Sequence, residues 1–145
     1  MDKENLLQLD PGKKVIYLGV PYTHKDPAIM AARVEQATKI TALLIEKGYI
    51  VFSPVPYTVP YEKMGVEPPE GWYKYLLYHL RNADVLYMLM FPGWQQSERL
   101  KLEQQYARRH GIPIVRVDPS DFPKNILRLT EMLINSVEPT ESEEN

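Results

Sequence analysis

Short apolar segments that alternate with helix-length segments limit this chain most strongly to one class of fold. Four of them are rich in β-branched and aromatic residues and are bounded by turn-forming residues; they span Lys14–Val20, Tyr49–Ser53, Asp84–Phe91 and Ile112–Val117. The third is apolar almost throughout, which is typical of a strand covered on both faces. Strands that alternate with helices predict an α/β fold with a doubly wound parallel sheet, in a single three-layer α/β/α domain.

The segments between these strands carry the start and stop signals of helices. Asp26 suits the N-cap and Pro27 the first helical position, while Gly48 and Gly111 follow two expected helix ends. The expected helices span Asp26–Lys47, Gly71–Asn82, Ser97–His110 and Phe122–Val137. Segment Pro54–Glu70 contains five prolines and no periodicity, so we expect a long loop there, of the kind that often forms a lid or a binding loop.

The chain of 145 residues has the length of one ordinary domain. We expect a flexible lead-in over residues 1–13, the α/β domain over 14–137 and an acidic, disordered tail over 138–145. The formal net charge of −2 provides no electrostatic reason to expect a nucleic-acid or membrane partner. The absence of cysteine excludes a disulfide framework, a thiolate zinc site and cysteine-based catalysis.

No sequence feature indicates a cofactor or a metal ion. His24, His79 and His110 lack metal-ligand spacing, and neither a phosphate-loop nor a dinucleotide glycine motif is present. The first residues lack the apolar run of a signal peptide, and no stretch reaches the length of a membrane span. We therefore expect a cytoplasmic protein without a cofactor.

Ligands of doubly wound sheets bind beyond the carboxyl ends of the strands, where the strand order reverses. This rule selects Gly19–His24, Ser53–Tyr57 and Phe91–Ser97 as the walls of a small-molecule site.

Glu103 is the acidic residue whose position is most unusual. The apolar residues that share its arc, at about 100° per residue, are Leu100, Leu102, Tyr106 and Ala107. This arc should face the sheet, and a carboxylate on a buried face is costly unless it is paired or used. The helix starts near the end of the third strand, so Glu103 points toward the predicted site. Alternatively, Arg99 forms a simple helical ion pair with it.

Three further residues are interpreted mainly as structural. Ser97 suits the N-cap of its helix, although the same position would also let it bind a phosphate or a sugar hydroxyl. Asp84 begins its strand, at the end away from the site. Tyr17 lies on the first strand, where a ring belongs more often to the core than to a catalytic site.

Short signatures in this chain resemble those of the nucleoside 2-deoxyribosyltransferase-like superfamily, notably its small bacterial and phage branch. The matching residues are Ile16–Tyr22, Phe52–Pro54, Gly93–Ser97, Glu103, Ala107 and Gly111. They occur in the family's order and spacing, and the match covers, in outline, residues 14–117.

The resemblance implies a flavodoxin-like fold and N-glycosidic chemistry. Glu103 matches the family's nucleophile, which attacks the anomeric carbon and forms a covalent glycosyl-enzyme, as in retaining glycosidases. Tyr17 matches the tyrosine that holds this carboxylate, and Ser97 matches the serine that binds the sugar or its 5′-phosphate. The implied substrate-binding residues are Gly19, Pro21, Tyr22, Ser53, Pro54, Gly93, Trp94, Ser97 and Arg99.

Two positions depart from the family pattern. Arg99 stands where the family usually has Gly, and its side chain either crowds the sugar site or adds a bidentate phosphate ligand. Leu76 stands where the family usually has an Asp that assists the leaving base, so that proton donor is missing. His79, one turn further along the same helix, is the alternative donor.

The sequence therefore leaves more than one function open. The first is an enzyme that cleaves or exchanges the N-glycosidic bond of a nucleoside or a nucleoside 5′-monophosphate. The second is a catalytically inactive nucleotide-binding sensor or regulatory module on the same fold. A structural domain within a larger assembly is a third interpretation. The resemblance also implies a homo-oligomer.

Overall fold

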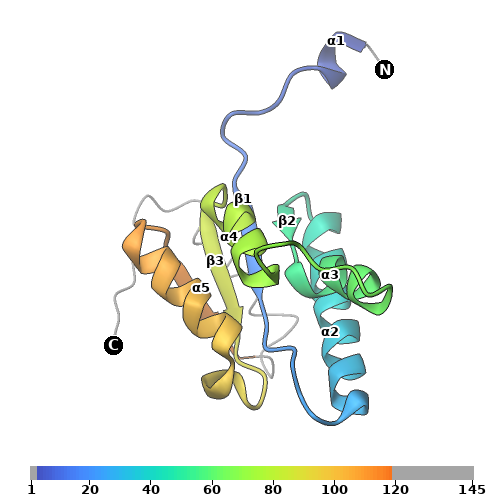
Figure 1. Ribbon diagram of the computed structural model, residues 1–145. Helices are drawn as coiled ribbons and strands as arrows, with labels where there is room; N and C mark the ends of the chain where they lie inside the picture. Colours follow the sequence, from blue (N-terminus) through green and yellow to red (C-terminus); the bar gives the residue numbers. More distant parts are fainter. Residues whose placement is uncertain (1–2, 119–145) are drawn as a thin grey trace.

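The computed structural model describes residues 3–118, which form a parallel sheet with helices on both faces (Figure 1). The strands are β1 (Val15–Gly19), β2 (Ile50–Phe52), β3 (Val85–Leu89) and β4 (Ile114–Val117). All pairs are parallel, and the sheet order is β2-β1-β3-β4. This flavodoxin-like arrangement confirms the predicted α/β fold. The helix expected over Phe122–Val137 and the tail 138–145 lie outside the described residues.

The helices lie between the strands, as the alternation predicts. They are α1 (Lys3–Leu6), α2 (Pro27–Glu46), α3 (Pro54–Lys63), α4 (Trp72–Arg81) and α5 (Glu98–Arg109), with a short 3-10 turn at Trp94–Gln96. Helix α1 lies within the segment expected to be a flexible lead-in. Within residues 3–118, no helix combines the length and the apolar character needed to cross a bilayer.

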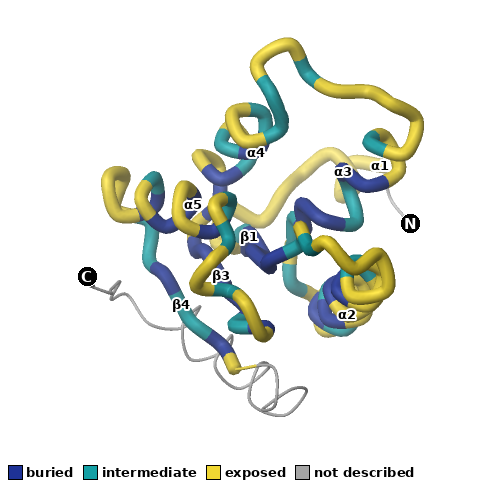
Figure 2. The backbone as a smooth tube through the Cα atoms, turned by 60° about the horizontal axis from the view of Figure 1, so that its bottom comes forward, coloured by how far each residue is buried: buried dark blue, intermediate teal, exposed yellow. Residues whose placement is uncertain are grey.

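The core has two halves because successive side chains of β1 point to opposite faces of the sheet. Ile16 and Leu18 belong to the half that α2 and α3 cover, with Ala37 of α2. Tyr17 belongs to the other half, with Leu80 of α4. In Figure 2 the buried strands run between α2 on one side and α4 and α5 on the other. Both faces of the central strands are therefore covered, as their apolar sequences require.

The helix boundaries follow the expected local chemistry. The side chain of Asp26 caps α2 by accepting a hydrogen bond from the backbone N–H of Ala28, at 2.9 Å. Gly48 and Gly111 follow the ends of α2 and α5 with φ of +97° and +69°, a backbone conformation that favours glycine. These three positions confirm the start and stop signals of the sequence.

The loop expected over Pro54–Glu70 is wrong for its first part, because residues 54–63 form α3. Pro54 and Pro56 occupy the first turn of the helix, where the backbone N–H has no acceptor within the helix and its loss costs nothing. Pro60 is the interior proline. The buried residues Val55 and Val59 lie four positions apart and hold α3 against the core.

The strand order reverses between β1 and β3. From β1 the chain moves to β2 on one side and then crosses to β3 on the other side, so the loops that follow β1 and β3 diverge. Both loops lie at the lower end of the molecule in Figure 1. At the opposite end, Asp84 accepts a hydrogen bond from the backbone N–H of Val15 at 2.8 Å, which confirms its structural role.

Candidate functional site

The structure brings Tyr17 of β1 and Glu103 of α5 together on the α4–α5 face of the sheet. The Tyr17 hydroxyl donates a hydrogen bond of 2.5 Å to Oε2 of Glu103. Both residues are buried, and Glu103 is only 2% exposed. The expectation that Glu103 lies on the buried face of its helix is confirmed.

The rest of the predicted apolar arc of α5 needs one correction. Leu102 is 37% exposed, and the buried residues are Leu100, Glu103, Gln104 and Ala107. The buried stripe is centred between Leu100 and Ala107, so Leu102, at the edge of the predicted arc, turns toward solvent.

The second carboxylate oxygen of Glu103 lies against the backbone of Gly19. A Cβ at Gly19 would lie 3.0 Å from Oε1 of Glu103 and 3.1 Å from Cδ2 of Leu100. Within the described residues, this Oε1 atom is buried and has no hydrogen-bond partner. The carboxyl group is thus held by a hydrogen bond at one oxygen and has no partner at the other. Because Gly19 has no side chain, Oε1 of Glu103 can lie this close to β1.

Burial sets the protonation behaviour of the pair. Burial raises the pKa of Glu103 to about 7, while the hydrogen bond from Tyr17 and the charge of Arg99 act in the opposite direction. Burial, and then the adjacent carboxylate, raise the pKa of Tyr17 well above its ordinary value. The tyrosine therefore remains a neutral donor at neutral pH, while Glu103 is divided between its protonated and ionised forms.

Arg99 does not form the ion pair with Glu103 that the sequence allowed. Within residues 3–118 the ion pairs are Lys39–Glu35 and Lys101–Glu98, both exposed. The Nη1 atom of Arg99 is buried and lacks a hydrogen-bond partner among the described residues. Its charge nevertheless lowers the pKa of Glu103 and opposes the rise in the pKa of Tyr22.

A group of aromatic side chains continues from Tyr17 toward α4. The Phe52 ring lies 5.7 Å from the Tyr17 ring and stacks on His79 at 4.1 Å with an interplanar angle of 6°. Tyr57 of α3 contacts both Phe52 and His79, and its hydroxyl hydrogen-bonds to that of Tyr75 at 2.8 Å. We call Phe52, Tyr57, Tyr75 and His79 the aromatic wall.

Sequence reasoning missed the aromatic wall as a unit. Its members come from β2, α3 and α4, and only the tertiary arrangement joins them. The available signal was the recurrence of aromatic residues at 75 and 79, one helical turn apart. Leu76, which stands where nucleoside 2-deoxyribosyltransferase-like proteins usually have Asp, lies in the buried core and has no acid–base chemistry.

The remaining predicted binding residues lie on the expected loops, but in different surroundings. Ser53 and Pro54 start α3 and are buried, and the Ser53 hydroxyl has no partner among the described residues. Pro21 and Tyr22 follow β1, and Tyr22 packs against the core on the α2 face.

The loop after β3 carries the other predicted residues. Trp94 opens the 3-10 turn, and Ser97 caps α5 by accepting a hydrogen bond from the backbone N–H of Leu100 at 3.2 Å. The N-cap interpretation of Ser97 is therefore confirmed. Gly93 has φ of +90°, and a Cβ there would lie 3.2 Å from Nη2 of Arg33.

Arg33 of α2 joins the two diverging loops, which the sequence did not reveal. Its Nη1 donates to the backbone oxygens of Tyr22 and Thr23, both at 3.3 Å, and its Nη2 donates to that of Pro92 at 2.6 Å. The available signal was a cation four residues before Ala37, on the buried face of α2.

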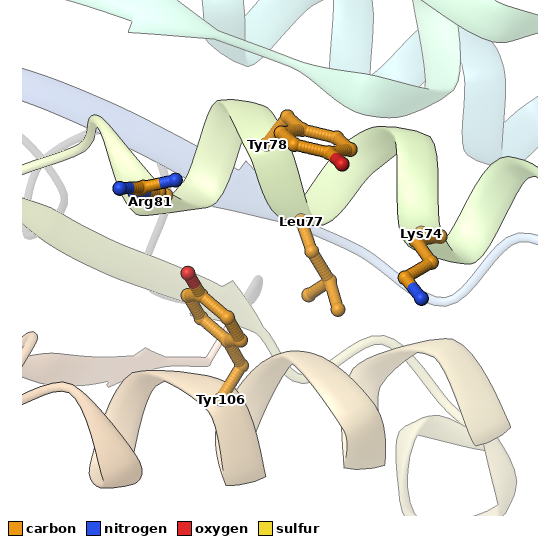
Figure 3. Close-up of a pocket in the computed structure, with 5 residues that line it drawn as sticks. All are labelled: Lys74, Leu77, Tyr78, Arg81 and Tyr106. Atoms are coloured by element: carbon orange, nitrogen blue, oxygen red, sulfur yellow. The ribbon is translucent and has the colours of Figure 1, made fainter.

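A small cavity of about 140 Å³ lies between α4 and α5, away from these residues. In Figure 3, Leu77 and Tyr106 project toward each other across it, and Lys74 and Arg81 lie along the same helix as Leu77. None of the predicted site residues lines it. Within residues 3–118, no group of three His, Cys, Asp or Glu side chains is arranged to hold a metal ion.

Comparison with known proteins assigns the chain to a family. No curated protein matches it. A family model matches residues 14–118, the segment that contains all four strands, the Tyr17–Glu103 pair and the loops around it. The chain therefore belongs to the family described as Domain of unknown function (DUF1937).

Proposed function

We propose that this protein cleaves or exchanges the N-glycosidic bond of a nucleoside or a nucleoside 5′-monophosphate, with Glu103 as the nucleophile. One observation carries the proposal: a buried carboxyl group held by Tyr17 at one oxygen, with its other oxygen unpartnered, near the carboxyl ends of the central strands. The resemblance of the signatures around both residues to nucleoside 2-deoxyribosyltransferase-like proteins supports the same reaction.

The reaction proceeds through two displacements. One oxygen of the ionised Glu103 attacks the anomeric carbon C1′; a C1′–O bond forms, and the C1′–N bond breaks. The base leaves with the bonding electron pair and takes up a proton from water or an acid. A water molecule or a second base then attacks C1′, the C1′–O bond breaks, and the carboxylate is released. Retention at C1′ follows from the two inversions.

The residues around Glu103 would position its carboxyl group and bind the phosphate and the base of the substrate. Tyr17 is a positioning residue, because its hydrogen bond fixes the carboxyl group and stabilises the ionised form. Arg99 also favours the ionised form, and its guanidinium suits a 5′-phosphate. The aromatic wall offers faces on which a base can stack, and His79 is its imidazole ring.

The direct test is a panel of nucleosides and nucleoside 5′-monophosphates incubated with the protein and analysed for free base by chromatography. We expect release from at least one substrate, with a loss of about a thousandfold in Glu103→Gln because the nucleophile is removed. Glu98→Gln, an exposed position on the same helix, is the matched control and should retain activity. Base release that survives Glu103→Gln removes Glu103 from the mechanism.

A nucleotide-binding module without catalysis is the second candidate. The 2% exposure of Glu103 favours it, because a nucleophile must meet its substrate and this one is closed from solvent. Arg99 also favours this second function, because nucleoside 2-deoxyribosyltransferase-like proteins usually have glycine at this position. Calorimetry with the same panel separates the two functions: saturable binding of a nucleotide with no release of base supports the module and contradicts the enzyme.

A further inference from the structure

A second cavity lies at the same edge of the sheet, on the face opposite Glu103. Its volume is about 450 Å³, within the range of small-molecule sites. Ile29, Ala32 and Arg33 of α2 line one side, and Phe91 and Gly93, after β3, line another. Phe91 belongs to the core cluster of the α2 face, whereas Tyr17 and Glu103 lie on the α4–α5 face. Glu103 and this cavity thus lie on opposite faces of the sheet, and Gly93, one of the residues expected to bind substrate, lines the cavity.

The charged group in this cavity has no counter-ion among the described residues. Arg33 is only 8% exposed, and residues 3–118 provide it with no carboxylate within ion-pair distance. Its hydrogen-bond partners are three backbone oxygens, which are dipoles and not charges. A buried cation without an opposite charge is costly, and burial lowers its pKa accordingly.

Arg33 also keeps unused hydrogen-bond donors. A guanidinium has five N–H donors, and at most three are engaged by the oxygens of Tyr22, Thr23 and Pro92, so at least two remain, one of them on Nε. No described residue accepts from Nε. Two donors on one planar group match the geometry of a carboxylate, sulfonate or phosphate.

The other polar side chains that line the cavity, His24 and Gln36, also provide hydrogen-bond donors. Nδ1 of His24 accepts a hydrogen bond from the backbone N–H of Asp26 at 2.9 Å, so Nε2 carries the ring proton and is a donor. Gln36 adds an amide, and none of the described residues that line the cavity is acidic. The remaining lining is apolar, and Ile29 is partly exposed there.

We propose that this cavity is a binding site for a small organic anion that has an apolar body and one carboxylate, sulfonate or phosphate group held by Arg33. The anion supplies the charge that Arg33 lacks, and the apolar body covers Ile29, Ala32 and Phe91. Because Arg33 also joins the loops that follow β1 and β3, the bound anion stabilises the crevice between them. The proposal does not depend on the chemistry of Glu103.

The test uses the full chain and two fluorescent probes of nearly the same shape, anionic anilinonaphthalene sulfonate and neutral N-phenylnaphthylamine. We expect saturable binding of one sulfonate probe per chain, by fluorescence and calorimetry, and binding of the neutral probe that is weaker by roughly tenfold or more. Equal affinities for the two probes, or no saturable binding of the sulfonate, overturn the proposal.

Two variants on the same helix locate the binding. Ala32→Trp fills the cavity and leaves Arg33 in place, whereas Ala42→Trp adds the same ring at another exposed position of α2 and is the matched control. We expect the first to abolish sulfonate binding and the second to leave it unchanged. Equal binding by both variants places the probe elsewhere and overturns the proposal. Near-UV circular dichroism of each variant establishes that the fold is intact.

Discussion

At the residue scale, the proposed chemistry rests on one carboxyl group whose two oxygens have different surroundings. Oε2 of Glu103 accepts from Tyr17, and Oε1 faces Gly19 without a partner among the described residues. The position of Glu103 was predictable, because a charged residue within an apolar helical arc is visible in the sequence. Its partner followed only from the resemblance, since residues 86 positions apart share no local pattern.

Replacing Tyr17 with phenylalanine should raise the pKa of Glu103 above about 7. The hydrogen bond from Tyr17 stabilises the ionised carboxylate, so its loss favours the protonated form. Carbon-13 NMR of the Glu103 carboxyl carbon across the pH range measures this directly and does not require a substrate. Tyr106→Phe, on the same helix, is the control and should leave the titration in place; an unchanged midpoint in Tyr17→Phe contradicts the role of the hydrogen bond.

Replacing Glu103 with glutamine should make folding less sensitive to pH. The pKa of Glu103 is raised from 4.5 in the unfolded chain to about 7 in the folded protein, so its stabilising contribution is complete below about 4.5 and is lost as the pH rises through about 7. Glutamine does not ionise, so the stability of the variant relative to the parent should rise by up to about 3 kcal/mol between pH 4.5 and pH 8.

Urea denaturation of both proteins at the two pH values measures this difference. A difference that stays constant with pH contradicts the raised pKa. Glu98→Gln, whose parent side chain is exposed, should show no such change.

At the scale of elements, the sequence predicted the helices with capping signals and missed the one rich in proline. Pro54 and Pro56 lie in the first turn of α3, where a missing N–H is harmless, but in the sequence they have the same appearance as loop prolines. The cap and the periodicity predicted helix α5 correctly. The same periodicity placed Leu102 wrongly on the buried face, because Leu102 lies at the edge of the apolar arc, where a small rotation of the helix decides between burial and exposure.

The cap of α5 should contribute to its stability. Ser97→Ala removes the oxygen that accepts from the backbone N–H of Leu100, and we expect a loss of about 1 kcal/mol in the free energy of unfolding. Chemical denaturation at neutral pH is the measurement. Ser97→Asp retains an acceptor and should remain close to the parent; equal losses in both variants would show that the serine contributes in another way.

At the scale of the whole molecule, the parallel sheet, and with it the edge at which a ligand is expected, followed from the alternation of strands and helices. The aromatic wall and the link made by Arg33 did not, because each joins segments whose spatial relation is set by strand order. Phe52 and His79 stack only because β2 and α4 meet beside β1. Arg33 reaches Pro92 only because β1 and β3 are neighbours in the sheet, so that the loops that follow them leave the same edge side by side.

At the edge of the sheet away from the site, one side-chain hydrogen bond joins two strands, and its loss should affect stability without affecting the site. Asp84 bonds the backbone N–H of Val15 and so joins the starts of β3 and β1. Asp84→Ala should lower the free energy of unfolding by about 1 kcal/mol. Asp84→Asn retains an oxygen acceptor and should lose less. An Asp84→Ala protein as stable as its parent would contradict the role of this bond.

The close approach of β1 and α5 at Gly19 couples two positions that a designer would treat separately. An added methyl group at 19 would lie 3.0 Å from Oε1 of Glu103, so the carboxyl group would have to shift by a few tenths of an ångström. We expect Gly19→Ala to destabilise the parent by about 1–3 kcal/mol and a Glu103→Ala background by less. A double-mutant cycle measures this coupling, and additive effects would exclude it. If the coupling is as large as the contact suggests, residues 19 and 103 must be substituted together in any redesign. The stability of a protein with alanine at 19 then measures how far α5 can move away from β1.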